Sequence, residues 1–202
     1  MFVPFLVVTV GYFLGSLPAG YFIPKWMRGV DIREMGSHST GFTNVLRNLG
    51  FWYGFLVLLA DMGKAWLLIA AVGWGTHSVW LQAMTLGALM LGSKFPVFLH
   101  FQGGRGVAML VGGVIPLLSW LAVIVLAVLW AVIFLATRTV MSLTNLIFAL
   151  VLMSYLLLSP EPVALKLLGV GAVLFLAASH LENIRRILRR EERPLFFKTN
   201  HS

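Results

Sequence analysis

Residues 101–107 place three glycines around a single arginine, Arg105, in a break between two strongly apolar segments. Glycine weakens a helix and reaches backbone angles that other residues avoid, so Gly103, Gly104 and Gly106 predict a turn whose N–H groups point into one small space. Such N–H groups and a guanidinium would make a good cradle for phosphate. A flexible hairpin with Arg105 as an anchor would have the same composition, because short glycine motifs are common.

A second polar cluster lies between Asp31 and Arg47. It combines small uncharged hydrogen-bonding side chains with two flanking arginines: Ser37, Ser39, Thr40, Thr43 and Asn44, between Arg33 and Arg47. Small hydroxyls, glycines and a guanidinium suit an oxyanion ligand, which is our expectation for the cluster as a whole. For any single hydroxyl a loop or capping role is the stronger expectation, with Thr43 as a candidate cap for a helix leading to Leu46.

A third cluster follows the last apolar segment. His180 and Asn183 are three residues apart and therefore face one side of a helix. A histidine at the membrane surface can donate a hydrogen bond to phosphate or act as a general base. An interfacial polar belt is the alternative interpretation.

Asp61 and Lys64 are charged residues inside an apolar segment, three apart and so on one helix face. An unpaired charge there costs about 2.5–3.5 kcal/mol or more, so we expect the two to form an ion pair. The pair either holds the floor of a site or simply fixes helix register, and the second role is slightly favoured.

The elements that position these clusters follow from composition. The chain of 202 residues is 59% hydrophobic and 11% charged, with a mean hydropathy of +0.92. A soluble domain is nearer half apolar and a quarter charged, so we predict one all-α integral membrane domain over residues 1–202. The absence of cysteine and the scattered histidines exclude a disulfide, a thiol nucleophile and a metal centre, and no cofactor is expected. The net charge of +8 is ascribed to orientation and anionic lipid rather than to nucleic acid.

Seven transmembrane helices are predicted, because about 20 apolar residues cross the hydrocarbon core. The expected spans are Phe2–Ile23, Phe51–Trp74, Val79–Ser93, 107–117, 119–136, Ser142–Leu158 and Val163–Ile184. Residues 107–136 would form a helix of about 45 Å, too long for one crossing, and Pro116 and Ser119 offer a break.

The basic residues favour this count. With loops 24–50, 94–106 and 137–141 and the tail 185–202 in the cytoplasm, every Lys and Arg except Lys64 and Lys166 falls on that side. A single crossing by residues 107–136 would move Arg138 and the tail to the other side. The amino terminus is therefore expected outside and the carboxyl terminus in the cytoplasm. The three clusters then share one face, where phosphate binding beside an apolar interior suits a substrate with a phosphate and a long acyl chain.

The motifs together resemble those of the bacterial membrane glycerol-3-phosphate acyltransferases that use acyl phosphate, the PlsY family. The matching segments, in order, are 15–20, 31–47, the Asp61-to-Lys64 element, 95–98 with 103–108, and 180–186. The resemblance covers nearly the whole chain. It implies seven helices in the bacterial inner membrane with a cytoplasmic active face, and transfer of a fatty acyl group from acyl phosphate to the 1-hydroxyl of glycerol 3-phosphate. The product would be lysophosphatidate for phospholipid synthesis, and the protein is expected to be a monomer.

Site residues are assigned on this basis. The predicted catalytic residues are Arg105, His180 and Asn183. The predicted substrate-binding residues are Ser37, Thr43, Asn44, Arg47, Gly103, Gly104, Gly106 and Ser142, with Asp61 and Lys64 as a structural ion pair near the site.

The chain departs from the family pattern at several of these positions. Arg105 replaces a lysine; arginine keeps the charge but is bulkier and is no proton shuttle. Ser39 replaces an asparagine, Ser93 replaces a histidine, and Ser142 matches the family's serine only loosely. These differences leave two alternatives: an inactive or weak relative that binds or transports a lipid phosphate, and an enzyme that acylates a different phosphorylated alcohol.

Overall fold

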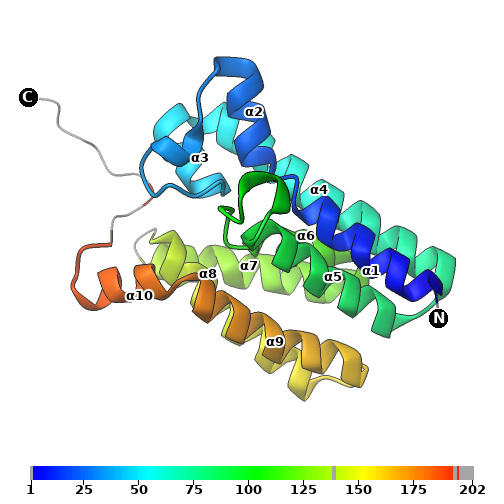
Figure 1. Cartoon of the computed structure of the whole chain (residues 1–202). Helices are drawn as coiled ribbons and strands as arrows, with labels where there is room; N and C mark the ends of the chain where they lie inside the picture. The colour runs from blue at the N-terminus through cyan, green and yellow to red at the C-terminus, as the bar shows by residue number, and fades with distance from the viewer. Residues whose placement is uncertain (1, 138–139, 193–194, 196–202) are drawn as a thin grey trace, which may run out of the picture.

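The computed structural model describes residues 2–137, 140–192 and 195 (Figure 1). Within this part all regular structure is helical. The α-helices are α1 (Phe2–Gly15), α2 (Ala19–Arg28), α3 (Phe42–Leu49), α4 (Phe51–Thr76), α5 (Val79–Lys94), α6 (Val107–Val114), α7 (Trp120–Ala136), α8 (Met141–Leu158), α9 (Val163–Ser179) and α10 (Leu181–Leu188). Three short 3₁₀ helices are η1 (Ile32–Glu34), η2 (Val97–Leu99) and η3 (Ile115–Leu117).

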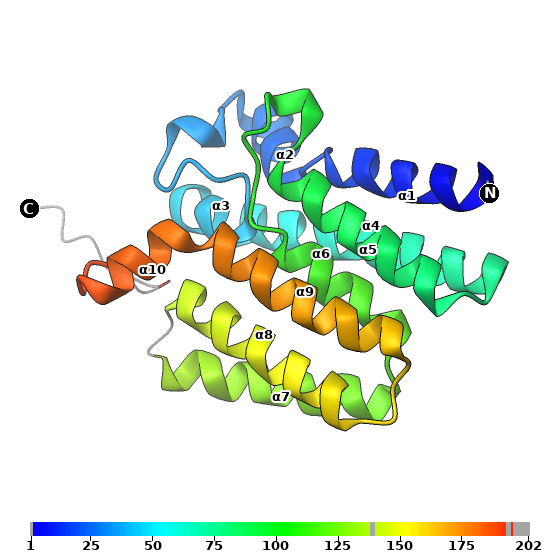
Figure 2. The same cartoon turned by 60° about the horizontal axis from the view of Figure 1, so that its bottom comes forward.

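The long helices form two groups that meet along α5 and α9. In one group α1 packs on α5 and α4 packs on α6; in the other α8 lies between α7 and α9 (Figure 2). A cluster of apolar residues forms the core between them, with Leu86, Met109, Leu152 and Leu176 at most 1% exposed. Large apolar side chains such as Leu135 remain exposed on the outside, as expected where lipid rather than water surrounds the helices.

Small residues allow the close helix contacts that the sequence predicts. A side chain at Gly15 would collide with the backbone of Leu89 on α5, and one at Gly11 would meet Thr85. The GxxxG spacing of Gly11 and Gly15 therefore serves α1–α5 packing. A side chain at Gly112 would likewise collide with the backbone of Met62, where α6 crosses α4.

The first apolar segment, expected as one span over Phe2–Ile23, is two helices with a break between them. α1 and α2 meet at an angle of 42° around Pro18. The predicted ion pair sits at this break, with Lys64 Nζ 2.8 Å from Asp61 Oδ1. Lys64 also donates to the carbonyl of Leu17, and Asp61 accepts from the amide of Ala19. A cation therefore meets the end of one helix and an anion the start of the next, which favours a structural role for the pair.

The last apolar segment is also broken, because α9 and α10 meet at 65° around His180. The single span expected over Val163–Ile184 is therefore two helices. By length and apolarity, α4 and α8 can each cross a membrane, and up to four crossings result if each bent pair is one span. Residues 107–117 and α7 are shorter apolar helices. Arg138, Arg193 and Lys198, which entered the charge count, lie outside the described residues.

The short helices gather at one end of the molecule. α2, α3 and α10 lie at the end opposite the amino terminus, and the turn before α6 lies next to them (Figures 1 and 2). This end carries the three polar clusters that the sequence singles out.

Candidate active site

Two adjoining cavities open at this end. The first has a volume of ≈ 410 Å³ and runs from a polar end, formed by Thr40, Arg105 and His180, to apolar walls from α6, η3, α7 and α8. The second has a volume of ≈ 270 Å³ and a mainly polar lining from the loop before α3, the glycine-rich turn and the start of α10. Ser39, Gly104 and Arg105 line both cavities, so Arg105 stands between them.

The structure brings together the predicted site residues from all three clusters. The first cavity is lined by Thr43, Asn44, Arg47, Asp61, Gly104, Arg105, Gly106, Ser142 and His180. The second cavity adds Ser37, Gly103 and Asn183. Lys64 lines neither cavity, in keeping with its place at the α1–α2 break.

The glycine-rich turn presents free amides at the start of α6. Gly106 adopts φ +77°, a conformation that side chains disfavour, and a Cβ there would also crowd the ring of Phe175. Gly104 N–H is already used, because it donates to Ser93 O at 2.8 Å. In the described structure the amides of Gly103, Arg105 and Gly106 donate no hydrogen bond to the protein. With the positive end of α6 they form an anion-binding geometry.

Arg105 adds a charge that water only partly screens. Burial lowers its pKa to about 10, and the nearby charges of Arg186 and Arg47 act in the same direction, whereas Glu192 favours the charged form. A pKa of about 10 still leaves the guanidinium ionised at neutral pH. A charge in a partly dry site interacts more strongly with an anion than one in bulk water.

Two buried polar atoms have no hydrogen-bond partner within the described residues: Thr40 Oγ1 and Asn183 Oδ1. Thr40 is 1% exposed and Asn183 is 2% exposed. The Thr40 hydroxyl lies close to Gly104, since a Cβ there would be 3.6 Å from Oγ1. An unsatisfied buried polar atom costs about 1–3 kcal/mol, so both are groups that a polar ligand would satisfy.

His180 is held in one orientation. Its Nδ1 lies 2.9 Å from the carbonyl of Leu176, a contact that requires the proton on Nδ1. The side chain is 1% exposed and lines the first cavity. In the neutral ring Nε2 is then the acceptor nitrogen, which suits a hydroxyl group of a ligand.

Asn44 organises the loop before α3. Its amide nitrogen donates to the carbonyls of Ile32, Met35 and Ser39 at 2.9–3.1 Å. Its Oδ1 accepts from Ser37 N at 2.9 Å and also from the Asn48 side chain. These contacts support a positioning role for Asn44, and the direct substrate contact expected from the sequence stays a prediction.

Thr43 is not a helix cap. The residue before α3 is Gly41, which makes no side-chain capping bond, and Thr43 lies inside the first turn of the helix. Its side chain lines the first cavity instead. The capping role considered for Thr43 was therefore wrong, and its predicted binding role stays a prediction.

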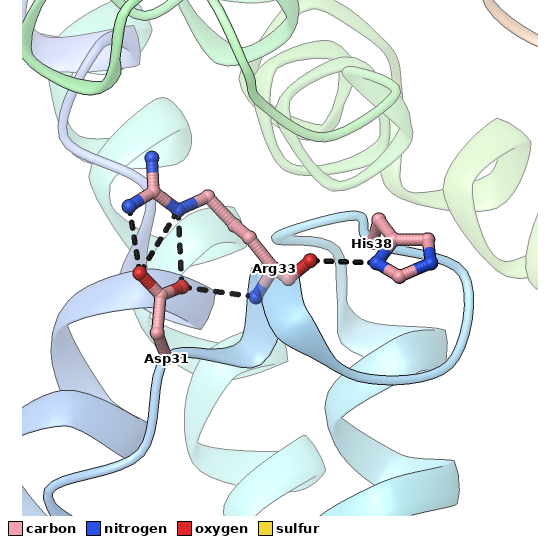
Figure 3. Close-up of polar contacts among 3 residues, drawn as sticks. All are labelled: Asp31, Arg33 and His38. Atoms are coloured by element: carbon pink, nitrogen blue, oxygen red, sulfur yellow. Dashed lines mark hydrogen bonds and ion pairs between the residues drawn. The ribbon is translucent and has the colours of Figure 1, made fainter.

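The arginine at the start of this loop is engaged elsewhere. Arg33 forms a two-pronged contact with Asp31, with its Nη2 at 2.6 Å from Oδ2 (Figure 3). Its guanidinium also lies over the ring of Tyr21. The hydrogen bond from Arg33 holds the pKa of Asp31 below its usual value, although burial acts in the opposite direction. His38 Nδ1 lies 2.7 Å from the carbonyl of Arg33 (Figure 3). Arg33 therefore stabilises the loop and lines neither cavity.

The sequence did not indicate Glu192. Its Oε1 accepts from Ser142 Oγ at 2.8 Å and from Asn183 Nδ2 at 2.7 Å, and Oε2 accepts from Arg186 Nε at 2.7 Å. Burial raises the pKa of Glu192, but these hydrogen bonds outweigh it and hold the pKa below its usual value. The one available signal was an acidic pair, Glu191 and Glu192, inside an arginine-rich tail.

The chain is similar to known proteins along most of its length. The sequence model of the glycerol-3-phosphate acyltransferase family matches residues 5–190. A glycerol-3-phosphate acyltransferase of Symbiobacterium thermophilum is 39% identical, over 95% of this chain and 94% of the relative. The one from Thermotoga petrophila is 36% identical, over 94% of this chain and 95% of the relative.

Two solved structures are similar along almost the whole chain. The glycerol 3-phosphate form of PlsY, an integral membrane glycerol 3-phosphate acyltransferase, has a TM-score of 0.89 at 32% identity and covers 98% of this chain and 96% of that one. The lysophosphatidic acid form has a TM-score of 0.84 at 29% identity, with 95% of each chain covered. The match over residues 5–190 and the relatives above 30% identity show that this chain belongs to the glycerol-3-phosphate acyltransferase family.

Proposed function

We propose that the protein transfers a fatty acyl group from acyl phosphate to the 1-hydroxyl of glycerol 3-phosphate, forming lysophosphatidate for phospholipid synthesis. The observation that carries this proposal is the first cavity, where free phosphate-binding groups lie at one end of an apolar chamber. Family membership points to the same reaction.

The first cavity would accept acyl phosphate in one orientation, with the acyl chain at the apolar walls and the phosphate at the polar end. The acyl chain would lie against the apolar walls around Val111, Leu126 and Phe148, and the phosphate would reach Arg105 and the amide of Gly106. These groups would stabilise the negative charge that develops on the carbonyl oxygen and the leaving phosphate. The Thr40 hydroxyl, which needs a partner, would add a further hydrogen bond.

The acceptor would be held by Ser37, Arg47, His180 and Asn183. The acceptor's 1-hydroxyl oxygen forms a bond to the acyl carbon, the bond from that carbon to the phosphate oxygen breaks, and the hydroxyl proton passes to the released phosphate. Acyl phosphate is already activated, so positioning of the two substrates supplies most of the rate enhancement. His180 Nε2 would orient the hydroxyl, with proton removal as its weaker role; the contact of Nδ1 with the Leu176 carbonyl supports this assignment.

The proposal includes a topology. A single membrane domain would cross the bacterial inner membrane seven times as a monomer, with the amino terminus outside and the active end in the cytoplasm. Supporting it, α2, α3 and α10 lie at the end opposite the amino terminus (Figure 1). The chain has no cysteine, so Lys25→Cys and His77→Cys variants can each be labelled from one side of sealed vesicles. Labelling of both from the same side would exclude this topology.

One assay tests the reaction. Purified protein is incubated with acyl phosphate and glycerol 3-phosphate, and lysophosphatidate is measured. Product formation at rates far above the buffer control is the expected result. Arg105, Ser39 and Ser93 differ from the family pattern, so the same assay also tests two alternatives: a different acceptor, and binding without catalysis. Consumption of acyl phosphate only with another phosphorylated alcohol would change the acceptor, and binding without turnover would make the protein a lipid-phosphate binder.

A further inference from the structure

The second cavity contains a cation that the mechanism above does not use. Lys94 is the last residue of α5 and lines this cavity together with Arg105. The Lys94 side chain is half-buried. Its ammonium group forms no ion pair or hydrogen bond with any described residue. A cation in this position repels Arg105, and it is attracted only at longer range by Glu182.

The position of Lys94 is fixed relative to the glycine-rich turn. Gly104 N–H donates to the carbonyl of the preceding residue, Ser93, at 2.8 Å. A Cβ at Gly103 would come within 2.9 Å of the Lys94 carbonyl, so the turn lies directly against the end of α5. Lys94 and Arg105 therefore stand as a pair of cations on one rigid support.

The remaining lining is suited to an anion. Ser37 and Ser39 contribute two hydroxyls. The Asn183 side chain is 2% exposed; its Nδ2 donates to Glu192, and its unpaired Oδ1 can accept from a hydroxyl of the ligand. The only carboxylate in the described lining is that of Glu182, which is exposed and belongs to the start of α10. Two positive charges with small polar donors match a phosphate group, which carries −1.5 to −2 charges near neutral pH.

We propose that Lys94 is a further substrate-binding residue, which shares with Arg105 one phosphate group bound in the second cavity. This phosphate belongs either to glycerol 3-phosphate as it binds or to the orthophosphate released from the donor; that identity rests on the proposed function. Because Arg105 also lines the first cavity, the site places this phosphate next to the reacting acyl carbon. Lys94 becomes a substrate-binding residue at the water-facing side of the site.

The test compares Lys94→Met with the wild type in detergent. Lys25→Met is the matched control. Lys25 is exposed on α2 at the same end of the molecule, and its substitution removes the same overall charge. Thermal unfolding checks folding, and Lys94→Gln replaces Lys94→Met if the latter does not fold. Binding of orthophosphate to the substrate-free protein, followed by ³¹P NMR, provides a readout that needs no turnover.

Lys94→Met is expected to weaken orthophosphate binding about tenfold, while Lys25→Met stays within about twofold of the wild type. In the acyl transfer assay, a matching rise in KM for glycerol 3-phosphate would assign the cavity to the acceptor. A rise only in the inhibition constant of orthophosphate would assign it to the released phosphate. Unchanged binding and unchanged constants, or an increase confined to the KM for acyl phosphate, would overturn the proposal. The wild-type protein could lack acyl transfer activity while Lys94→Met still weakens orthophosphate binding. That result would contradict the proposed function and leave the role of Lys94 in phosphate binding intact.

Discussion

The loop from Asp31 to Gly50 and the turn from Phe95 to Gly106 carry similar polar groups and use them differently. In the loop, Arg33 is paired with Asp31 and the Asn44 amide is bonded to the backbone. In the turn, Arg105 faces two cavities, and the amides of Gly103 and Gly106 donate to no described protein group. The groups that stabilise the loop have their hydrogen bonds filled within the protein, whereas the groups we propose to hold a ligand have no protein partner.

The largest effect is expected at the turn. Arg105→Ala should lower kcat/KM by about 10²–10³-fold or more, because it removes the charge beside the leaving phosphate. Arg105→Lys should keep activity within about tenfold of the wild type, since it retains the charge and loses only the two-pronged contact. Steady-state acyl transfer by both variants measures this. Near-normal turnover by Arg105→Ala would remove the turn from the active site.

Asn44→Ala tests the other side of the comparison. It leaves Ser37 N–H and three backbone carbonyls without their partner, at about 1–3 kcal/mol for each group that stays buried. We expect a clearly lower thermal unfolding midpoint, with activity falling in proportion to the folded fraction. Asn44→Asp should be at least as destabilised, because it places a carboxylate oxygen against the carbonyls of Ile32, Met35 and Ser39. An unchanged midpoint with a raised KM would instead make Asn44 a direct substrate ligand.

Thr40→Val should affect activity rather than stability, in contrast to Asn44→Ala. The hydroxyl has no partner in the described structure, so its removal should leave the unfolding midpoint unchanged or raise it. If the hydroxyl bonds the charged donor, kcat/KM should drop about tenfold. Thr40→Ser keeps the hydroxyl and is the control for activity. A less stable variant with full activity would show that Thr40 belongs to the scaffold.

The smallest effect is expected for Asp31→Asn, which should lower stability by at most about 1 kcal/mol and leave catalysis unchanged. The pKa of Asp31 is lowered in the folded protein, so its ionised form stabilises the fold above the ordinary value of about 3.9 and this contribution is lost as the pH falls below it. The difference in unfolding midpoint between wild type and variant should thus be present at neutral pH and shrink below about pH 4. A difference that grows on acidification would contradict the role given to the pair.

Sequence patterns predicted the helices better than their interruptions. Hydropathy located apolar segments that match α4, α5, α7 and α8 closely, because side-chain apolarity alone determines them. It missed the breaks at Pro18 and His180, where the apolar pattern continues while the backbone turns. The Asp61–Lys64 pair was predicted from its spacing, but its position at the first break depends on tertiary contacts with Leu17 and Ala19.

At the site, the sequence indicated which segments converge but not which side chains are free. Arg105 and His180 were identified from residue type and setting, and both line the first cavity. Asn44 and Thr40 could not be told apart, because both are small polar residues of one loop. Glu192 was missed because its contacts depend on the tertiary fold. Ser142 is fifty residues away in the chain and belongs to α8, and Asn183 belongs to α10.

A structure with glycerol 3-phosphate and a non-reactive acyl phosphate analogue tests the central claim most directly. We expect phosphate oxygens within hydrogen-bond distance of Arg105, of the Gly103 and Gly106 amides and of Thr40 Oγ1, with the acyl chain along α6. The Asp31–Arg33 pair and the Asn44 contacts should remain as they are. Phosphate bound instead by Arg33 or by the Asn44 amide, with the turn left empty, would contradict the account.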